Sequence, residues 1–199
     1  MKIKSIILSI ICLPIIQVSG QEKLLTKQIK VAEVIDFEKN INDMVTFFDQ
    51  NVSLSKDFYP LADKYVTTHK PIIAYRDALV YLPMYAEYFY TAKDSIVRLV
   101  SYNWEKDRFG NVFKKQIMWE DESRKIETYN KEYDRIKHML FESFGNPISS
   151  DLSPQLTEGV NGKFYTRESI WETEDYYADL QMMFGGITYR IRFKLYWKN

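Results

Sequence analysis

The longest regular pattern in the chain is an apolar stripe within residues 120–144. Apolar side chains recur there at alternating spacings of three and four residues, namely Ile126, Tyr129, Tyr133, Ile136 and Leu140. This spacing places them on one face of an α-helix, with charged side chains on the remaining surface. Gly145 stands where a left-handed C-cap is expected, and Pro147 prevents the helix from continuing. Because the stripe must be buried, we expect this long helix to organise the packing of the rest of the chain.

After the helix, three segments have the composition and alternation of β-strands, namely residues 164–171, 177–184 and 187–197. Gly185-Gly186 predicts a two-residue hairpin loop, because glycine tolerates the positive φ of tight turns. In that register Leu180 faces Ile191 on an apolar side, and Asp179 faces Arg192 on a polar side. We therefore expect one face of the hairpin to meet the helix and the other to be solvated.

The segments before the helix complete the predicted fold. Three more strands are expected at residues 78–82, 85–91 and 96–104. A short helix is expected at 37–49, with Asp36 as its N-cap, and residues 50–70 and 146–162 look irregular. The sequence thus predicts the α+β class. In the predicted fold the elements follow the order three strands, long helix, three strands, and the six or so strands form one antiparallel sheet. The amphipathic helix and a short N-terminal helix pack on one face of this sheet.

The first twenty residues predict a secretory signal peptide. Lys2 and Lys4 precede an apolar run over residues 6–16, and small residues at 18–20 provide a cleavage position. The chain would then comprise the signal peptide 1–20 and a single domain 21–199, exported to the periplasm or the extracellular space. The apolar run is too short for a membrane span, and no later stretch qualifies as one. The abundance of Ile, Lys, Asn and Tyr is compatible with a bacterial source.

Cysteine usage and net charge exclude several classes of function. Cys12, the only cysteine, lies in the predicted signal peptide, so the exported part lacks disulfides, thiolate nucleophiles and cysteine metal sites. Two of the 27 basic residues, Lys2 and Lys4, also fall there, which leaves 25 against 27 acidic residues and a net charge of −2. This balance gives no indication of nucleic-acid binding.

No residue pattern predicts a catalytic or metal centre. The two histidines, His69 and His138, are not accompanied by a nucleophile-elbow serine, and no spacing suits zinc or a cofactor. Carboxylates do cluster near the turn after the fourth predicted strand, at Glu168, Glu172, Glu174 and Asp175. Paired carboxylates can hydrolyse glycosides, although a charged, solvated turn explains the same cluster.

The candidate binding residues lie on the last two predicted strands: Arg190, Arg192, Lys194, Tyr177 and Asp179. The row of cations on one strand face could hold a carboxylate, sulfate or phosphate group. Paired charges on a solvated face are the alternative interpretation. The many aromatic residues of 85–104 could likewise contact a protein or sugar, or be buried beneath the N-terminal helix.

These patterns predict a small exported, non-enzymatic domain that binds a protein partner or a small ligand through its sheet face, without a cofactor. One alternative is an exported hydrolase or glycan-acting enzyme that uses the carboxylates of 168–175. The other is a carrier with a hydrophobic-ligand pocket between helix and sheet. An enzyme should bring two carboxylates together and raise the pKa of one, whereas a binding module should have a filled core and an exposed patch. The sequence does not indicate the oligomeric state.

Overall fold

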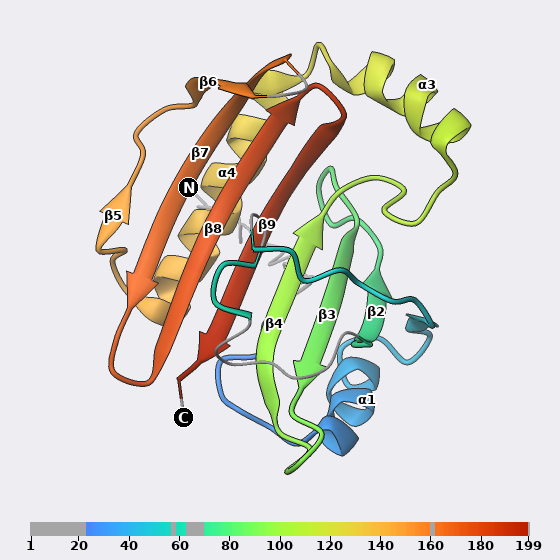
Figure 1. Ribbon diagram of the computed structural model, residues 1–199, viewed down its shortest axis with the longest axis vertical. Coiled ribbons are helices and arrows are strands. Elements are labelled where there is room, and N and C mark those ends of the chain that lie inside the picture. Colours follow the sequence, from blue (N-terminus) through green and yellow to red (C-terminus); the bar gives the residue numbers. More distant parts are fainter. Residues whose placement is uncertain (1–22, 57–58, 63–69, 160–161, 199) are drawn as a thin grey trace, which may run out of the picture.

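The computed structural model describes residues 23–56, 59–62, 70–159 and 162–198, so the predicted signal peptide lies outside the described part. The described residues form a nine-stranded antiparallel sheet and three helices (Figure 1). The α+β class is therefore right in outline. The prediction of six strands and one long helix is wrong, because further strands extend both edges of the sheet and the long helical stretch is divided.

The strands are β1 (Thr46–Phe48), β2 (Ile72–Arg76), β3 (Met84–Tyr90), β4 (Val97–Trp104), β5 (Ser149–Ser150), β6 (Gln155–Gly159), β7 (Gly162–Glu172), β8 (Tyr176–Gly185) and β9 (Thr188–Trp197). They form two three-stranded meanders, β2-β3-β4 and β7-β8-β9. β4 pairs with β9 between them, so the two meanders share one continuous sheet. β1 extends one edge, and β5 and β6 both pair with β7 at the other.

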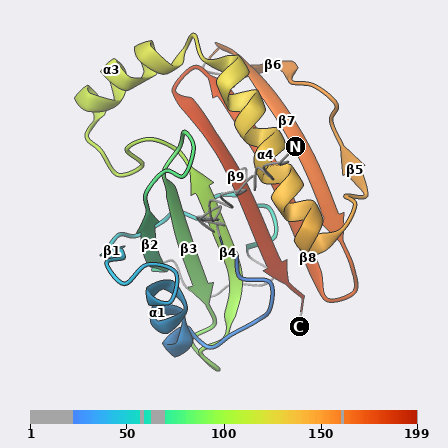
Figure 2. The ribbon, with the colours of Figure 1, turned by 180° about the vertical axis from the view of Figure 1, so that it is seen from behind.

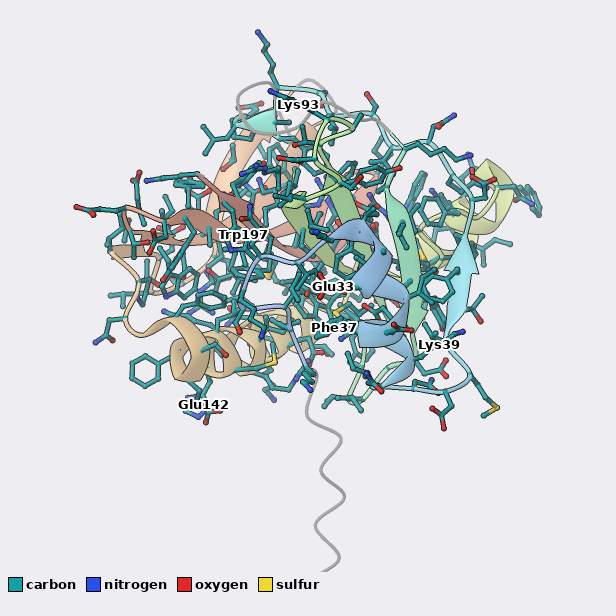
Figure 3. All side chains as sticks on the ribbon, turned by 90° about the horizontal axis from the view of Figure 1, so that it is seen from below. Glu33, Phe37, Lys39, Lys93, Glu142 and Trp197 are labelled. Atoms are coloured by element: carbon teal, nitrogen blue, oxygen red, sulfur yellow. The ribbon has the colours of Figure 1, made fainter. Side chains whose placement is uncertain are left out.

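The described helices are α1 (Val31–Lys39), α3 (Val112–Glu122) and α4 (Ile126–Phe144). α1 and α4 cover the same face of the sheet (Figure 2) and contribute side chains to one apolar core. Viewed from below, α4 with Glu142 lies beneath the sheet layer that contains Trp197 of β9 (Figure 3). None of the described helices combines the length and apolar character needed to cross a bilayer.

The predicted apolar stripe of the long helix is confirmed, but its start is not. Tyr129, Tyr133, Ile136 and Leu140 are fully buried along α4, which ends at Phe144 as expected. Residues 120–122 instead belong to α3, and the chain turns before α4 begins. At the end of α3 the carboxylate of Glu122 is buried, where it accepts hydrogen bonds from Tyr81 and Tyr129.

Several predicted elements in the first half are shifted. The helix expected at 37–49, with Asp36 as its N-cap, is wrong beyond Lys39: α1 covers residues 31–39, so Asp36 lies inside it, and residues 46–48 form β1. At the start of α1 the backbone N–H of Lys30 donates to Glu33 Oε2 at 2.8 Å. The strand expected at 78–82 is a bend that is exposed at residues 78–80 and buried at Leu82, and β2 precedes it. The strands expected at 85–91 and 96–104 correspond to β3 and β4. The predicted loop at 146–162 contains β5 and β6.

The C-terminal hairpin keeps its predicted faces in a different register. Gly185 pairs with Thr188, so the turn consists of Gly186 and Ile187, and Asp179 faces Lys194 rather than Arg192. This turn requires glycine, because φ is +135° at Gly185 and +60° at Gly186. A shift of two residues leaves every side chain on its predicted face. The apolar face accordingly packs against α4.

The opposite face of the hairpin is not solvated as predicted. Asp179, Arg192 and Lys194 are only 2%, 4% and 4% exposed. Residues 49–56 run across the front of β3 and β4 (Figure 1), and Val52 and Tyr59 of this irregular stretch join a second apolar cluster there. The sequence shows that the stretch is irregular, but not that it lies over the sheet.

Candidate functional site

The structure brings the five predicted binding residues onto one face of the sheet, the face opposite α4. Arg190, Arg192 and Lys194 alternate along β9, and Tyr177 and Asp179 alternate along the neighbouring β8. The register pairs Asp179 with Lys194 and Tyr177 with Tyr196. The five residues therefore form two groups, one around Lys194 and one around the two arginines.

The residues of the first group contact one another and their neighbours in the sheet. Lys194 Nζ lies 2.9 Å from Asp179 Oδ1, and both side chains are almost fully buried. Burial raises the pKa of Asp179 and lowers the pKa of Lys194, and in each case the partner's charge opposes the shift. The ring of Tyr177 packs on the ring of Tyr196 at a centroid distance of 6.1 Å. This end of the row is a buried ion pair flanked by aromatic rings.

The second group lines a pocket that we call the arginine pocket. It has a volume of about 280 Å³ and is lined by Asn51, Val52, Ser53, Tyr59, Arg108, Phe109, Arg190 and Arg192. The lining comes from the irregular stretch over the sheet, the turn after β4, and the start of β9. Three guanidinium groups from two elements therefore meet around one small space.

Arg108 is fixed by two carboxylates. Its Nη2 lies 2.6 Å from Glu87 Oε1 of β3, and its Nη1 donates to Glu105 just after β4. The turn that carries it closes with a hydrogen bond from the N–H of Gly110 to the carbonyl of Asp107. A side chain at Gly110 would collide with the Asp107 carboxylate, because an added Cβ would lie 1.9 Å from Oδ2. A side chain at this position would therefore require the Asp107 carboxylate to move.

Arg192 is held by neighbours from two segments. Its Nε donates to Asn103 Oδ1 of β4, and its guanidinium lies 4.9 Å from the centroid of the Tyr59 ring. Asn103 Nδ2 and the Tyr59 hydroxyl both donate to Glu87 Oε2, at 3.2 and 3.1 Å. The buried carboxylate of Glu87 therefore connects the supports of Arg108 and Arg192 into one network.

Arg190 lies at the edge of the cluster and is partly buried. It also lines a second pocket of about 180 Å³, which it shares with Arg108 and with Lys115, Trp119 and Ile187 among others. Burial and the nearby charges of Arg192 and Arg108 lower the pKa of Arg190 to about 10, although Glu105 opposes this. Its positive charge is therefore disfavoured where it stands.

Charged side chains of both signs meet in the cluster. The described residues that interact electrostatically there include three cations, Arg108, Arg190 and Arg192, and two anions, Glu87 and Glu105. Burial would raise the pKa of Glu105, but the three guanidinium groups lower it overall. Three guanidinium groups and two carboxyl groups therefore interact in the cluster, among the described residues.

The carboxylates singled out from the sequence are dispersed. Glu172 is exposed and lies 2.8 Å from Lys198 Nζ, and Glu174 and Asp175 are exposed in the turn between β7 and β8. Glu168 is partly buried on the same face as Asp179, and burial, followed by the Asp179 charge, raises its pKa. Glu168 therefore lies near another carboxyl group, that of Asp179, whereas Glu172, Glu174 and Asp175 are spread over the exposed turn.

Other sequence candidates have structural roles or lie outside the described residues. His138 is 77% exposed, and its Nε2 lies 3.7 Å from Glu142, while His69 is outside the described part. The aromatic residues of β3 and β4 are buried on both faces, Tyr88 and Tyr102 toward the helices and Phe89 on the other side. Within the described residues no group of three His, Asp or Glu side chains is placed to hold a metal ion.

The sequence analysis missed Arg108, Glu87, Glu105 and Asn103 as parts of this site. One signal was present: Ser101, Asn103 and Glu105 place polar side chains at every second position, alternating with Tyr102 and Trp104. That alternation marks the face of β4 that meets Arg192. Arg108 gave no such signal, because it reaches the cluster from a turn.

No protein-family model, curated protein or solved structure that was compared matches the chain.

Proposed function

We propose that this protein is an exported binding domain that holds a small anionic ligand in the arginine pocket on its sheet face. The observation that carries the proposal is the meeting of Arg108, Arg190 and Arg192 around one pocket. Guanidinium groups bind carboxylate, sulfate and phosphate through charge-assisted, often bidentate hydrogen bonds. An anion between them would relieve the mutual repulsion.

The rigidity of the pocket supports a binding role. Arg108 is held by Glu87 and Glu105, and Arg192 is held by Asn103 and the Tyr59 ring. Side chains that are already ordered lose little conformational entropy when a ligand arrives. The two arginines would therefore act as a prepared receptor, and Arg190, at the edge of the cluster, would complete the contact.

The size of the pocket favours a small ligand over a protein partner. A volume of about 280 Å³ is about nine times the ~30 Å³ that one water occupies in the liquid. The pocket thus suits a group of roughly that many heavy atoms, or one charged side chain of a larger partner. We favour the small ligand, because the lining residues Val52 and Tyr59 are themselves buried.

The alternatives have weaker support. A hydrolase based on residues 168–175 would use carboxylates that are mostly exposed and dispersed, with Glu168 and Asp179 as the remaining pair. A hydrophobic-ligand carrier would need space between α4 and the sheet, where the side chains of the α4 stripe are fully buried. Neither alternative brings several groups of the same kind around one pocket, as the three guanidinium groups of the arginine pocket are.

The experiment is isothermal titration calorimetry of the purified protein with a panel of small anions at constant ionic strength. We expect at least one anion to bind, and Arg190→Gln to weaken its binding by about tenfold or more, because a charge-assisted contact is lost. Arg98→Gln is the matched control, since it removes the same charge from a partly exposed arginine of β4 that pairs with Asp94 at 2.8 Å. If no anion binds, or if Arg190→Gln binds as well as the wild type, the proposal fails.

A further inference from the structure

We propose that a groove along the exposed side of α4 binds a neutral saccharide, as a second site apart from the arginine pocket. The groove has a volume of about 530 Å³ and lies where the end of α4 meets the chain that follows it. Its lining residues are Asp134, Lys137, His138, Phe141, Asn146 and Pro147. α4 covers the sheet face opposite the arginine pocket (Figure 2), so the two sites lie on different sides of the sheet.

The lining residues that α4 contributes are brought together by their spacing. Asp134, Lys137, His138 and Phe141 are three or four residues apart, which places neighbouring side chains on one side of a helix. The buried stripe of α4 takes up another side of the same helix. After the helix ends, Asn146 and Pro147 return along it and form the second wall of the groove.

His138 and Phe141 give the groove an exposed aromatic surface. Their rings are nearly parallel, with an interplanar angle of 14° and a centroid distance of 6.5 Å. The His138 side chain is 77% exposed and Phe141 is 45% exposed. An aromatic ring can be covered favourably by an apolar face of a ligand, because both surfaces are then removed from water. The C–H face of a sugar ring is a surface of this kind.

The same groove contains fixed polar groups. Asp134 Oδ1 lies 2.9 Å from Arg167 Nη2, and Lys137 Nζ donates to Ser150 Oγ at 2.5 Å. These contacts hold both side chains in place. A carboxylate has a second acceptor oxygen and an ammonium group has three N–H donors, so both groups can also bind a ligand. The Asn146 amide adds a donor and an acceptor from the opposite wall.

The mixture of polar groups favours a neutral, hydroxylated ligand over a charged one. Asp134 and Lys137 are three residues apart on α4, so their Cβ atoms are separated by about 5–6 Å. A charged group of a ligand would be attracted by one of them and repelled by the other. A hydroxyl group both donates and accepts, so it can use both. A saccharide combines such hydroxyl groups with an apolar ring face, and it therefore matches both parts of the lining.

The size and the walls of the groove favour a saccharide over a segment of a protein. The volume is roughly eighteen times the ~30 Å³ that one water occupies in the liquid, which suits one or two sugar rings. An extended peptide would need an unpaired strand edge, and an amphipathic helix would need a row of apolar side chains. The lining consists instead of helix side chains and a loop, with Phe141 and Pro147 as its apolar residues.

The experiment is isothermal titration calorimetry of the purified protein with neutral sugars and their charged derivatives. The neutral probes are glucose, galactose, mannose, cellobiose, maltose and lactose. Glucosamine and galacturonate are the charged derivatives of glucose and galactose. We expect at least one neutral sugar to bind, and each charged derivative to bind no tighter than its neutral parent. If no neutral sugar binds, or if a charged derivative binds tighter than its parent, the proposal is overturned.

Substitutions locate the binding to the groove. Phe141→Ala should weaken the binding of that sugar by about tenfold or more, because the exposed ring is lost. Asn146→Ala should weaken it by about fivefold or more, because hydrogen bonds are lost. Phe113→Ala is the matched control, since it removes a ring that is 73% exposed on α3, and it should leave the affinity unchanged. The replaced side chains are exposed, so each variant should keep the urea midpoint of the wild type by circular dichroism.

The outcomes also separate this site from the arginine pocket. Arg190→Gln should leave the sugar affinity unchanged, because Arg190 lies on the other side of the sheet. An unchanged sugar affinity in a folded Phe141→Ala, or a lost affinity in Phe113→Ala or Arg190→Gln, would overturn the groove as the binding site. The anion titrations test the proposed function on their own, so either site can fail without the other.

Discussion

Charged side chains are buried on both faces of the sheet, but they are arranged differently on each face. On the helix face Arg76 donates from Nε and Nη2 to the carboxylate of Glu38, at 2.8 and 2.6 Å, and the Tyr88 hydroxyl donates to the same carboxylate. Arg76 Nη1 also donates to the carbonyl of Lys23. This balanced group joins α1, β2, β3 and the described N-terminal residues. On the other face Arg108, Arg190 and Arg192 meet around the arginine pocket.

The balanced group leads to a prediction about stability. Arg76→Met should lower the free energy of unfolding by roughly 3–5 kcal/mol, because it leaves the fully buried Glu38 carboxylate without its cation. The double variant Glu38→Leu/Arg76→Met should lose much less than the sum of the two single losses, since neither charge then remains buried alone. Urea unfolding followed by circular dichroism measures all three values.

The control for this prediction is Arg98→Met on β4. Arg98 pairs with Asp94 at 2.8 Å, but both side chains are partly exposed, so its loss should cost only about 0–1 kcal/mol. An Arg76→Met protein no less stable than Arg98→Met would show that the buried pair does not join the elements as described.

Among the secondary-structure elements, the junction of α3 and α4 depends on one ionised carboxyl. Glu122 accepts hydrogen bonds from Lys106 Nζ at 2.7 Å and from the hydroxyls of Tyr81 and Tyr129. Burial would raise the pKa of Glu122, but the hydrogen bonds from Lys106 and Tyr81, together with Lys125, lower it to about 2 from 4.5. The ionised form thus stabilises the position of α3.

This pKa predicts how stability depends on pH. Because the folded pKa lies below the unfolded value of 4.5, the contribution of Glu122 is fully present above about pH 4.5 and is lost as pH falls toward 2. The difference in urea midpoint between the wild type and Glu122→Gln should therefore shrink across this range. Comparing the two proteins removes the effect of the other carboxyls. A difference that is constant between pH 6 and pH 2.5 would contradict the prediction.

Elements with a regular pattern were predictable from the sequence, and those defined by distant contacts were not. The stripe of α4 and the alternation of β7 to β9 identify their faces, because each pattern repeats several times within one element. The break between α3 and α4 has no glycine or proline, and it follows from the contacts of Glu122 with Tyr81 and Lys106, which are far away in sequence.

The same distinction applies to the candidate site. Arg190 and Arg192 were placed together correctly, because alternation along one strand is a local property. Their burial and their neighbours depend on a turn at Arg108, on the pairing of β3 with β4, and on a stretch around Val52 that crosses the sheet. No local pattern in the sequence carries that information.

For the whole molecule, the described residues form two similar halves that share one core. In each half a helix precedes a three-stranded meander, α1 before β2-β3-β4 and α4 before β7-β8-β9. The halves meet where β4 pairs with β9, and Val34 of α1, Tyr133 of α4, Trp104 and Trp171 all belong to one apolar cluster. A core shared in this way should make the halves unfold together.

Two single-tryptophan variants test this cooperativity. One retains Trp104, in the first meander, and the other retains Trp171, in the second, with the remaining tryptophans replaced by phenylalanine. Both side chains are almost fully buried, so the fluorescence of each should report the unfolding of its own half. We expect each fluorescence midpoint in urea to coincide with the far-ultraviolet circular dichroism midpoint of the same variant. A fluorescence midpoint that precedes the circular dichroism midpoint in either variant would show that its half unfolds separately. If one half unfolded separately, the arginine pocket would be disrupted before the other half unfolds. The reason is that Asn103 of β4 positions Arg192 of β9 across the boundary between the halves.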